Sequence, residues 1–264
     1  MTTTSHRPVA LVTGASSGIG RALARELAGR GFDLILTART AETLDEAACE
    51  IEARGVHVTA LTADLTTPEG VEEVAKTLPG RRLDVAAINA GIGLGGPFAE
   101  TDLDHELELI DLNVRSSVHL AKRVVQQMVA AQRGSILFTS SVASTHPDTF
   151  EAVYGASKTF LQSFAKALRQ ELKPTGVTVT SLMPGPTETR FFHRAEMDDT
   201  KIGASDGKDD PADVARKAVE GLLAGDEQVV PGGQNVAITA LSRVLPDQVK
   251  AALHGKLAAP GSGR

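Results

Sequence analysis

Short apolar runs alternate along this chain with longer segments of helical periodicity. The runs are rich in β-branched residues and apolar nearly throughout, as strands are when both faces of their sheet are covered. We expect strands at Val9–Thr13, Leu34–Ala38, Val56–Ala63, Val85–Asn89, Ser135–Thr139 and Val177–Leu182. The periodicity predicts helices at Ile19–Arg30, Glu42–Arg54, Glu69–Leu78, Leu103–Gln132 and Thr159–Lys173. This alternation predicts an α/β fold, a doubly wound parallel sheet of six to seven strands with helices on both faces.

No internal repeat and no linker divides the 264 residues, so we predict a single domain over 1–264. One long polar stretch, Gly185–Pro211, follows the last long strand. A loop of that length inside a compact domain is usually functional or mobile. The last residues, Leu257–Arg264, are rich in Gly, Pro and Ala, and we expect them to be frayed.

Composition narrows the classes of function. No run reaches the roughly 18 apolar residues of a membrane helix, and the polar start lacks the apolar middle of a secretion signal. A net charge of −6 with mixed signs argues against nucleic acid as the partner. Cys49 is the only cysteine, expected as a buried or half-buried inert thiol, and the seven histidines show no metal-ligand spacing. We therefore expect a cytoplasmic protein with no metal and no membrane or nucleic-acid partner.

A glycine-rich turn closes the first predicted strand and opens a helix. Glycines there allow a tight turn and let a diphosphate approach the amide groups, while the helix N-terminus adds partial positive charge. Ser16 and Ser17 can cap the helix and also donate to phosphate. The turn contains Gly14, Ser16, Ser17, Gly18, Ile19 and Gly20, spaced G-x-x-x-G-x-G rather than the common G-x-G-x-x-G. The turn predicts a dinucleotide-binding site.

The end of the second strand bears on the choice of dinucleotide. An acidic residue near this point would bind the adenosine ribose and repel a 2′-phosphate. Here Arg39 follows the strand instead, and its guanidinium suits a phosphate. NADP(H) is therefore favoured over NAD(H), the alternative being an arginine that is simply solvated.

Tyr154, the only tyrosine, precedes Lys158 by four residues, which places the two side chains on one face of a helix. The pair follows the fifth strand, at the edge where doubly wound sheets bind ligands. A nearby ammonium and a positive nicotinamide ring would both favour the ionised phenol. Tyr154 is thus a candidate acid and base.

Together these residues resemble the short-chain dehydrogenase/reductase family, whose motifs occur here in order over roughly residues 8 to 190. The resemblance implies a single Rossmann-type domain and an NADP(H)-dependent oxidoreductase that interconverts a ketone or aldehyde and an alcohol. It implies a catalytic tetrad of Asn113, Ser141, Tyr154 and Lys158. It further implies cofactor contacts from Asp64, Leu65, Asn89, Ala90, Gly91, Pro184, Gly185, Thr187 and Thr189, besides the glycine turn, Arg39, Tyr154 and Lys158.

In this resemblance Tyr154 donates the proton to the carbonyl oxygen and Ser141 hydrogen-bonds the same oxygen, with Ser140 the less favoured serine. Lys158 holds the nicotinamide ribose, and Asn113 positions a water for proton relay. Asn113 as a helix hydrogen-bonder and Asp64 as a turn residue are the structural alternatives. Two positions depart from the family pattern: Ile88 replaces an asparagine, and Ser144 replaces a glycine and is expected to reshape the substrate edge.

Three other functions use the same features. A nucleotide-sensing regulator would keep the fold without turnover, but it has no need of Ser141 and Tyr154. Enoyl reductases of related sequence have a longer Tyr-to-Lys spacing, and sugar-nucleotide epimerases usually have longer chains and a different glycine spacing. Enoyl reduction and epimerisation are both disfavoured.

Two segments extend beyond the cofactor site. We expect 187–210 to form a lid over the substrate, made flexible by Gly203 and Gly207, with only one of Phe191 and Phe192 facing the pocket. An unstructured surface loop is the alternative.

A stripe on the long helix either faces the sheet or, as in the family, joins subunits of a homodimer or homotetramer. The stripe comprises Leu107, Ile110, Val114, Val118, Ala121 and Val125.

Overall fold

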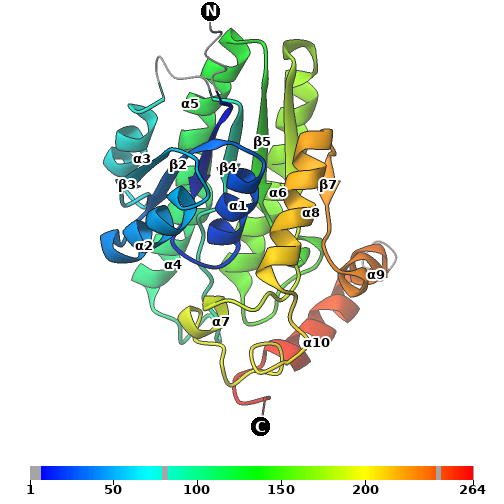
Figure 1. Cartoon of the computed structure of the whole chain (residues 1–264). Helices are drawn as coiled ribbons and strands as arrows, with labels where there is room; N and C mark the ends of the chain where they lie inside the picture. Colours follow the sequence, from blue (N-terminus) through cyan, green and yellow to red (C-terminus); the bar gives the residue numbers. More distant parts are fainter. Residues whose placement is uncertain (1–6, 79–82, 242–244, 264) are drawn as a thin grey trace, which may run out of the picture.

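The computed structural model describes residues 7–78, 83–241 and 245–263 and has a parallel sheet at its centre (Figure 1). Its seven strands lie in the order β3-β2-β1-β4-β5-β6-β7, and every neighbouring pair is parallel. The strands are β1 (Val9–Thr13), β2 (Asp33–Ala38), β3 (Val58–Thr62), β4 (Val85–Ile88), β5 (Gly134–Thr139), β6 (Val177–Leu182) and β7 (Gln228–Val229). The predicted doubly wound fold is confirmed. Only β7 lacks a counterpart among the expected runs, because a two-residue strand has no readable pattern.

Helices cover both faces of the sheet (Figure 1). One apolar layer packs against α1 (Gly18–Gly29), α2 (Ala41–Glu52) and α8 (Pro211–Ala224). The opposite layer packs against α3 (Pro68–Ala75), α5 (Ser116–Ala130) and α6 (Ala152–Leu172). Because both faces are covered, the strands are apolar along almost their whole length, as the sequence pattern indicates.

Several element boundaries differ from the predicted ones. The long helix consists of α4 (Leu103–Ile110), a π-helical turn at Asp111–Arg115 and then α5. Helix α6 begins at Ala152 rather than Thr159, and therefore carries both Tyr154 and Lys158. Periodicity alone does not reveal a π turn, which inserts one extra residue into an otherwise continuous helix.

Cys49 is exposed, so its predicted burial is wrong. Helix α2 buries the neighbouring positions Leu44, Ala47, Ala48 and Ile51, and Cys49 falls on the opposite side of the helix. Among the described residues, no helix combines the length and the apolar character needed to cross a membrane.

The end of the chain packs against the loop after β6 and is not frayed as expected. Helices α7 (Phe191–Arg194), α9 (Gly233–Leu241) and α10 (Asp247–Ala258) lie at the same end of the sheet (Figure 1). The Gly263 amide donates to the Asp199 carbonyl at 2.8 Å, and the Lys201 amide donates to the Ser262 hydroxyl at 3.0 Å. These backbone contacts hold a segment whose composition alone suggests disorder.

The order of the strands reverses between β1 and β4, because β2 and β3 lie on one side of β1 and β5 to β7 lie beyond β4. Loops at the carboxyl ends of these two strands diverge, and ligands of doubly wound sheets bind in the resulting crevice. The glycine turn after β1 and Asn89 after β4 both lie at this point.

The packing predicts opposite effects for two glycines of α1. A Cβ added at Gly20 would lie 2.1 Å from the Gly14 carbonyl oxygen, whereas one added at Gly29 would meet nothing within 4 Å. We expect Gly20→Ala to lower the free energy of unfolding by about 1–3 kcal/mol through overpacking. Gly29→Ala should raise it by about 0.5–1 kcal/mol, because alanine restricts the unfolded chain. Urea denaturation of both variants checks this, and a loss of stability in Gly29→Ala equal to that in Gly20→Ala would contradict it.

Candidate active site

A cavity of about 760 Å³ runs along the carboxyl ends of the strands. Its size is that of a site for a cofactor or other small molecule. All of the predicted cofactor-binding residues and three of the four predicted catalytic residues line it. They are Gly14, Ser16, Ser17, Gly18, Ile19, Gly20, Arg39, Asp64, Leu65, Asn89, Ala90, Gly91, Ser141, Tyr154, Lys158, Pro184, Gly185, Thr187 and Thr189. Asn113 is not among the lining residues and lies buried behind the wall.

The glycine turn has the conformation that its sequence predicts. Gly14 and Gly18 have φ of 66° and 53°, values that side-chain-bearing residues adopt at a cost. Ser17 occupies the N-cap position of α1, but its side chain makes no capping hydrogen bond, which corrects the expected capping role. The first amide groups of α1 therefore lack a side-chain cap and border the cavity, the arrangement that suits an anion.

At the adenosine end, as defined by the family pattern, Arg39 meets a carboxylate. Its Nη1 donates to Glu108 Oε1 at 2.6 Å, and its side chain is 65% exposed. Asp64 Oδ1 accepts hydrogen bonds from the Thr66 amide and hydroxyl, so Asp64 shapes a turn and lines the cavity at once. An exposed arginine at position 39 and a turn-forming aspartate at position 64 are both compatible with these places on the cavity wall.

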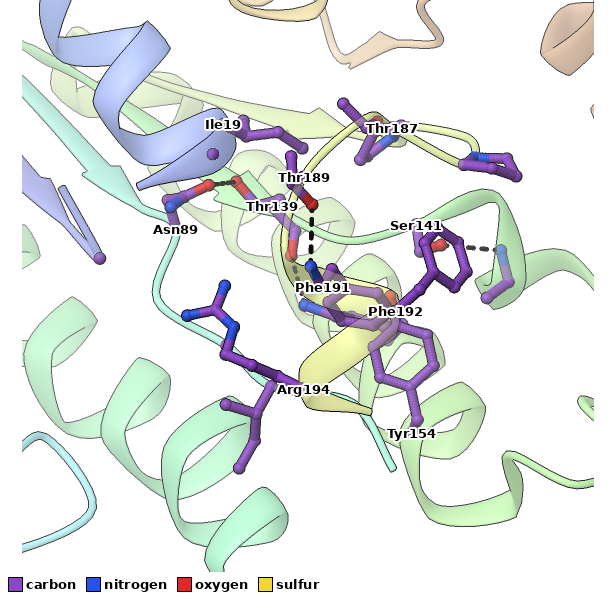
Figure 2. A pocket seen from close by; sticks show the side chains of 18 of the residues that line it. Ile19, Asn89, Thr139, Ser141, Tyr154, Thr187, Thr189, Phe191, Phe192 and Arg194 are labelled. Atoms are coloured by element: carbon purple, nitrogen blue, oxygen red, sulfur yellow. Dashed lines mark hydrogen bonds between the residues drawn. The ribbon is translucent and has the colours of Figure 1, made fainter. Parts of the chain in front are cut away.

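Asn89 connects three strands at the base of the cavity (Figure 2). Its amide Nδ2 donates to the Thr13 carbonyl at 3.0 Å, and its Oδ1 accepts from the Thr139 hydroxyl at 3.0 Å. Ile88, which departs from the family pattern, is buried in the core on the α5 and α6 side. Its effect thus falls on strand packing, not on the cavity.

Ser141 and Tyr154 line the other end of the cavity, with the Ser141 side chain close enough to act on the pKa of the Tyr154 phenol. Burial raises the pKa of the Tyr154 phenol, the nearby Glu151 and Asp148 raise it further, and the Ser141 side chain lowers it. Ser141 also accepts from the Ala143 amide at 3.1 Å, which orients its hydroxyl group. Without a bound partner, Tyr154 is therefore held in its neutral form, ready to donate a proton.

Lys158 is buried beneath the tyrosine, and burial lowers the pKa of its ammonium to about 8. Its Nζ donates to the Thr139 carbonyl at 3.0 Å and lies 5.6 Å from the centre of the Tyr154 ring. Ser140, the less favoured serine of the pair, is turned away from this chemistry, because its hydroxyl donates to the Lys158 carbonyl.

Asn113 lies in the π-helical turn and is fully buried. Its Nδ2 donates to the Ile92 carbonyl at 2.9 Å and to Ser157 Oγ at 3.0 Å, while its Oδ1 accepts from the Ile92 amide. Asn113 thus fixes the strand-to-loop segment after Gly91. A Cβ added at Gly91 would lie 3.0 Å from Asn113 Oδ1 and 3.2 Å from Lys158 Nζ, so glycine keeps these two groups close to the cavity.

The segment after β6 forms a third wall. A parallel bridge between Thr187 and Asp209 joins its two ends, and α7 lies between them. Both Phe191 and Phe192 line the cavity, so the expectation that only one does is wrong. The Phe191 ring contacts the Tyr154 ring at 5.3 Å between centroids, and Figure 2 shows these side chains together.

Gly203, one of the two glycines expected to make this segment flexible, is buried and has a packing role. A Cβ there would lie 1.9 Å from the Met197 carbonyl oxygen, so Gly203 permits a close backbone approach. Phe192 and Met197 pack with Ala258 of α10 in a small apolar cluster. The segment is therefore a packed unit, not an unstructured loop.

Sequence reasoning missed several residues of the cavity. His146, Glu151 and His254 line the end near Tyr154. Arg194 of α7 also lines the cavity, and its guanidinium points away from Tyr154 (Figure 2). Ser144 is not among the lining residues, and its hydroxyl donates to the Ser141 carbonyl. His254 comes from α10, about a hundred residues after His146, and no local spacing in the sequence signals their meeting.

Comparison with known proteins identifies the family of this chain. The family model described as short chain dehydrogenase matches residues 8–200. The chain therefore belongs to the short-chain dehydrogenase family and is an oxidoreductase of that family.

The similar proteins include enzymes and a solved complex. Sulfoacetaldehyde reductase 2 of Chromohalobacter salexigens is 40% identical over 187 residues, covering 69% of this chain and 74% of that protein. Serine 3-dehydrogenase of Agrobacterium fabrum is 34% identical over 184 residues, covering 69% and 72%. A short-chain dehydrogenase from Sphingobium yanoikuyae in complex with NADPH is 30% identical, with a TM-score of 0.81 over 90% of this chain and 96% of that one.

The buried ammonium predicts a specific dependence of stability on pH. Burial lowers the pKa of Lys158 from 10.5 to about 8, so between these values the unfolded chain binds a proton that the folded chain does not. Stability should then rise with pH across this window in the cofactor-free protein. We expect Lys158→Met to remove this rise and to stabilise the protein near pH 7 by about 3 kcal/mol.

Denaturant titrations at several pH values measure both effects, with Lys166→Met, an exposed lysine of the same helix, as the control. If the stability of wild type and Lys158→Met changes in parallel between pH 8 and 10.5, the Lys158 ammonium is not disfavoured by burial.

Proposed function

We propose that this protein is an NADP(H)-dependent oxidoreductase that interconverts a ketone or aldehyde and an alcohol, with Tyr154 as the proton donor and acceptor. One observation carries the proposal: Ser141 and Tyr154, with Lys158 beneath the Tyr154 ring, line the same cavity as the glycine turn of α1. A dinucleotide held along the turn and an acid at the far end together suit carbonyl reduction.

The residues on the cavity wall fit the cofactor. The first amides of α1 and the close approach allowed by Gly14 and Gly20 suit its diphosphate, and Gly91 leaves room beside Lys158 for its nicotinamide ribose. Thr187 and Thr189, on the wall after Pro184 and Gly185, would receive the carboxamide, as the family pattern implies. When bound, the cofactor supplies or accepts the hydride.

The chain's own residues handle the proton. Ser141 would hydrogen-bond the substrate oxygen, and Tyr154 would donate its proton to that oxygen in the reducing direction. The Lys158 ammonium, close to the phenol ring, would stabilise the phenolate left behind. Asn113 would hold the Ile92 segment in place through its hydrogen bonds. It would also position a water for proton relay, as the family pattern implies. The tetrad remains our proposal on this geometry.

The preference for NADP(H) is supported by the positive charge at one end of the cavity. Arg39, Ser17 and Thr40 line that end, where a 2′-phosphate would extend from the adenosine ribose. Arg194 is a second guanidinium on the wall, and its pKa is lowered by burial and by the charges of Arg190 and Arg39. Two arginines whose charges repel each other gain most from a shared dianion.

The substrate class is supported by the pocket end and by the relatives. Phe191 and Phe192 supply apolar surface beside Tyr154, and His146, Glu151 and His254 supply polar groups. The similar proteins named above are an aldehyde reductase and a dehydrogenase of an amino acid that carries a hydroxyl group. A small polar carbonyl compound is the class that fits both observations.

We further propose that the whole chain is one cofactor-binding domain in which residues 187–210 act as a lid. The Glu188 amide donates to the Asp209 carbonyl and the Asp209 amide to the Pro186 carbonyl, at 2.9 and 2.8 Å, so the ends of the segment are fixed. The part between them places Phe191 against Tyr154. A segment fixed at its base and covering the acid can exclude water from the reaction.

A homodimer or homotetramer is proposed from the exposed side of α4 and α6. Leu107 and Ile110 of the predicted stripe are 48% and 40% exposed, so this end of the stripe does not face the sheet. Ile110 borders a shallow apolar groove with Val114, Val153 and Phe160. A cytoplasmic location is proposed as well, consistent with a single cysteine in the sequence.

Removing the phenol hydroxyl tests the reaction. We expect Tyr154→Phe to lower turnover at least about 100-fold on any accepted ketone or aldehyde, because the proton donor is lost. NADPH affinity should change little. NADPH absorbance measures turnover, and fluorescence titration measures affinity, with Ser163→Ala on the exposed side of the same helix as the control. A Tyr154→Phe variant that keeps most of its turnover disproves the assignment.

Cofactor preference is tested by two substitutions at one ion pair. Arg39→Ala should lower the preference for NADPH over NADH by roughly tenfold to a hundredfold, the worth of a charge-assisted hydrogen bond of about 1.5–3 kcal/mol. Glu108→Gln should keep or increase that preference, since it frees Arg39 from its carboxylate partner. Values of kcat/KM with both cofactors decide, and equal preference in wild type and Arg39→Ala would rule out the role.

The lid is tested by its aromatic contact. We expect Phe191→Ala to raise KM for the substrate and leave NADPH affinity unchanged, because the ring touches Tyr154 at the substrate end. Proteolysis within 187–210 should slow when NADP and a substrate analogue are present. Cutting that ignores both ligands, together with wild-type kinetics in Phe191→Ala, would show that the segment is not a lid.

A further inference from the structure

A buried cluster of two histidines and two carboxylic acids lies beside Tyr154 and has no part in the proton transfer described above. His146 and Asp148 come from the loop between β5 and α6, Glu151 precedes α6, and His254 comes from α10. His146, Glu151 and His254 line the cavity, while Asp148 lies behind them. The cluster therefore joins the end of the chain to the loop that carries Ser141.

The hydrogen bonds of the two imidazoles fix where their protons lie. His254 Nδ1 is 3.1 Å from the Thr149 carbonyl, which can only accept, so Nδ1 carries the proton. The Thr145 hydroxyl donates to the Val142 carbonyl, so it accepts from His146 Nδ1 at 3.1 Å. Each neutral imidazole therefore presents the lone pair of its Nε2 to the cluster.

These lone pairs face carboxylates. His146 Nε2 lies 3.1 Å and His254 Nε2 lies 3.7 Å from Asp148 Oδ1, and His254 Nε2 is 3.4 Å from Glu151 Oε2. Asp148 is 6% exposed, and neither of its oxygens has a hydrogen-bond partner among the described residues. The nitrogen and oxygen atoms of His146, Asp148 and His254 thus converge in one buried place, with Glu151 beside them, and groups of these types bind cations there when their protons are displaced.

Two of the three separations between ligand atoms are close to those of a tetrahedral metal centre. Zinc binds histidine nitrogen and carboxylate oxygen at about 2.0–2.2 Å, and at the tetrahedral angle this separates ligand atoms by roughly 3.3 Å. The three ligand atoms of His146, Asp148 and His254 lie within 4.8 Å of one another, and the two histidine-to-aspartate distances bracket 3.3 Å. The hydrogen bonds at both Nδ1 atoms are the outer contacts that orient metal-binding imidazoles.

We propose that His146, Asp148 and His254 bind a divalent transition-metal ion of the zinc class, with the fourth coordination position on the cavity side next to Glu151. A set of two nitrogens and one oxygen suits zinc or cobalt and does not suit magnesium or calcium, which prefer oxygen ligands. A dication also balances the two carboxylates in a buried place. Lys250, the neighbouring ammonium, contacts Asp247 at 2.6 Å and the Thr145 carbonyl at 3.4 Å.

The Asp148 carboxylate requires a glycine at position 155 of α6. A Cβ added at Gly155, the residue after Tyr154, would lie 2.2 Å from Asp148 Oδ2. Glycine inside a helix destabilises it relative to alanine. Its presence in the first turns of α6 is explained by the need to admit the Asp148 side chain. The expectation from sequence that no metal is bound rested on local spacing, which does not capture a site assembled from a loop and a distant helix.

Metal titration of the full chain tests the proposal. The protein, prepared without a histidine tag and stripped with a chelator, is titrated with ZnCl₂ or CoCl₂ alone. We expect one ion per chain, a rise in the thermal unfolding midpoint, and the intense visible absorption of cobalt in a site of low coordination number. MgCl₂ should give none of these.

Asp148→Asn and His254→Gln should each weaken zinc binding by at least about tenfold. His193→Gln is the matched control, because His193 also pairs with an aspartate, Asp198, but lies exposed on the surface, and it should bind zinc like wild type. Circular dichroism and cooperative unfolding show whether each variant is folded. Absence of stoichiometric binding, unchanged affinity in folded Asp148→Asn, or equal loss in His193→Gln would each overturn the proposal.

Discussion

The hydrogen bonds of Asn89 hold together the carboxyl ends of β1, β4 and β5. The Asn89 side chain donates to the Thr13 carbonyl and accepts from the Thr139 hydroxyl. The main-chain amide of Asn89 donates to the Thr13 hydroxyl. Parallel strands have no mutual hydrogen bonds beyond their ends, so this point would otherwise open. Because the glycine turn follows Thr13 and the loop with Ser141 follows Thr139, Asn89 sets the distance between the two halves of the cavity. A dinucleotide bound along the cavity would have to span this distance.

The parts of the fold and site that could be predicted are those with local causes. Covered parallel strands are apolar throughout, and a turn that needs positive φ at Gly14 and Gly18 shows its glycines in the sequence. The helical spacing of Tyr154 and Lys158 also places two side chains on one face. These signals arise within about twenty residues, and the structure brings the corresponding side chains to one cavity.

What could not be predicted has non-local causes. The meeting of His146 with His254 depends on how α10 docks against the loop after β5, through contacts such as the Thr149 hydroxyl with the Ala251 carbonyl. The pairing of Arg39 with Glu108 depends on the position of α4 relative to β2. The order at the end of the chain depends on backbone bonds to the 199–201 segment. Composition indicates only that each of these residues is polar or small, and says nothing of its partner.

The close contact between Gly155 and Asp148 also has a consequence for how such chains can diverge. An alanine at position 155 is sterically excluded while an aspartate fills position 148, since the added methyl group would overlap its carboxylate. A relative that loses the aspartate is released from this restriction and can accept a larger residue after its tyrosine. A residue larger than glycine at the second position should therefore mark, in a bare sequence, the chains that lack the buried acid at the first.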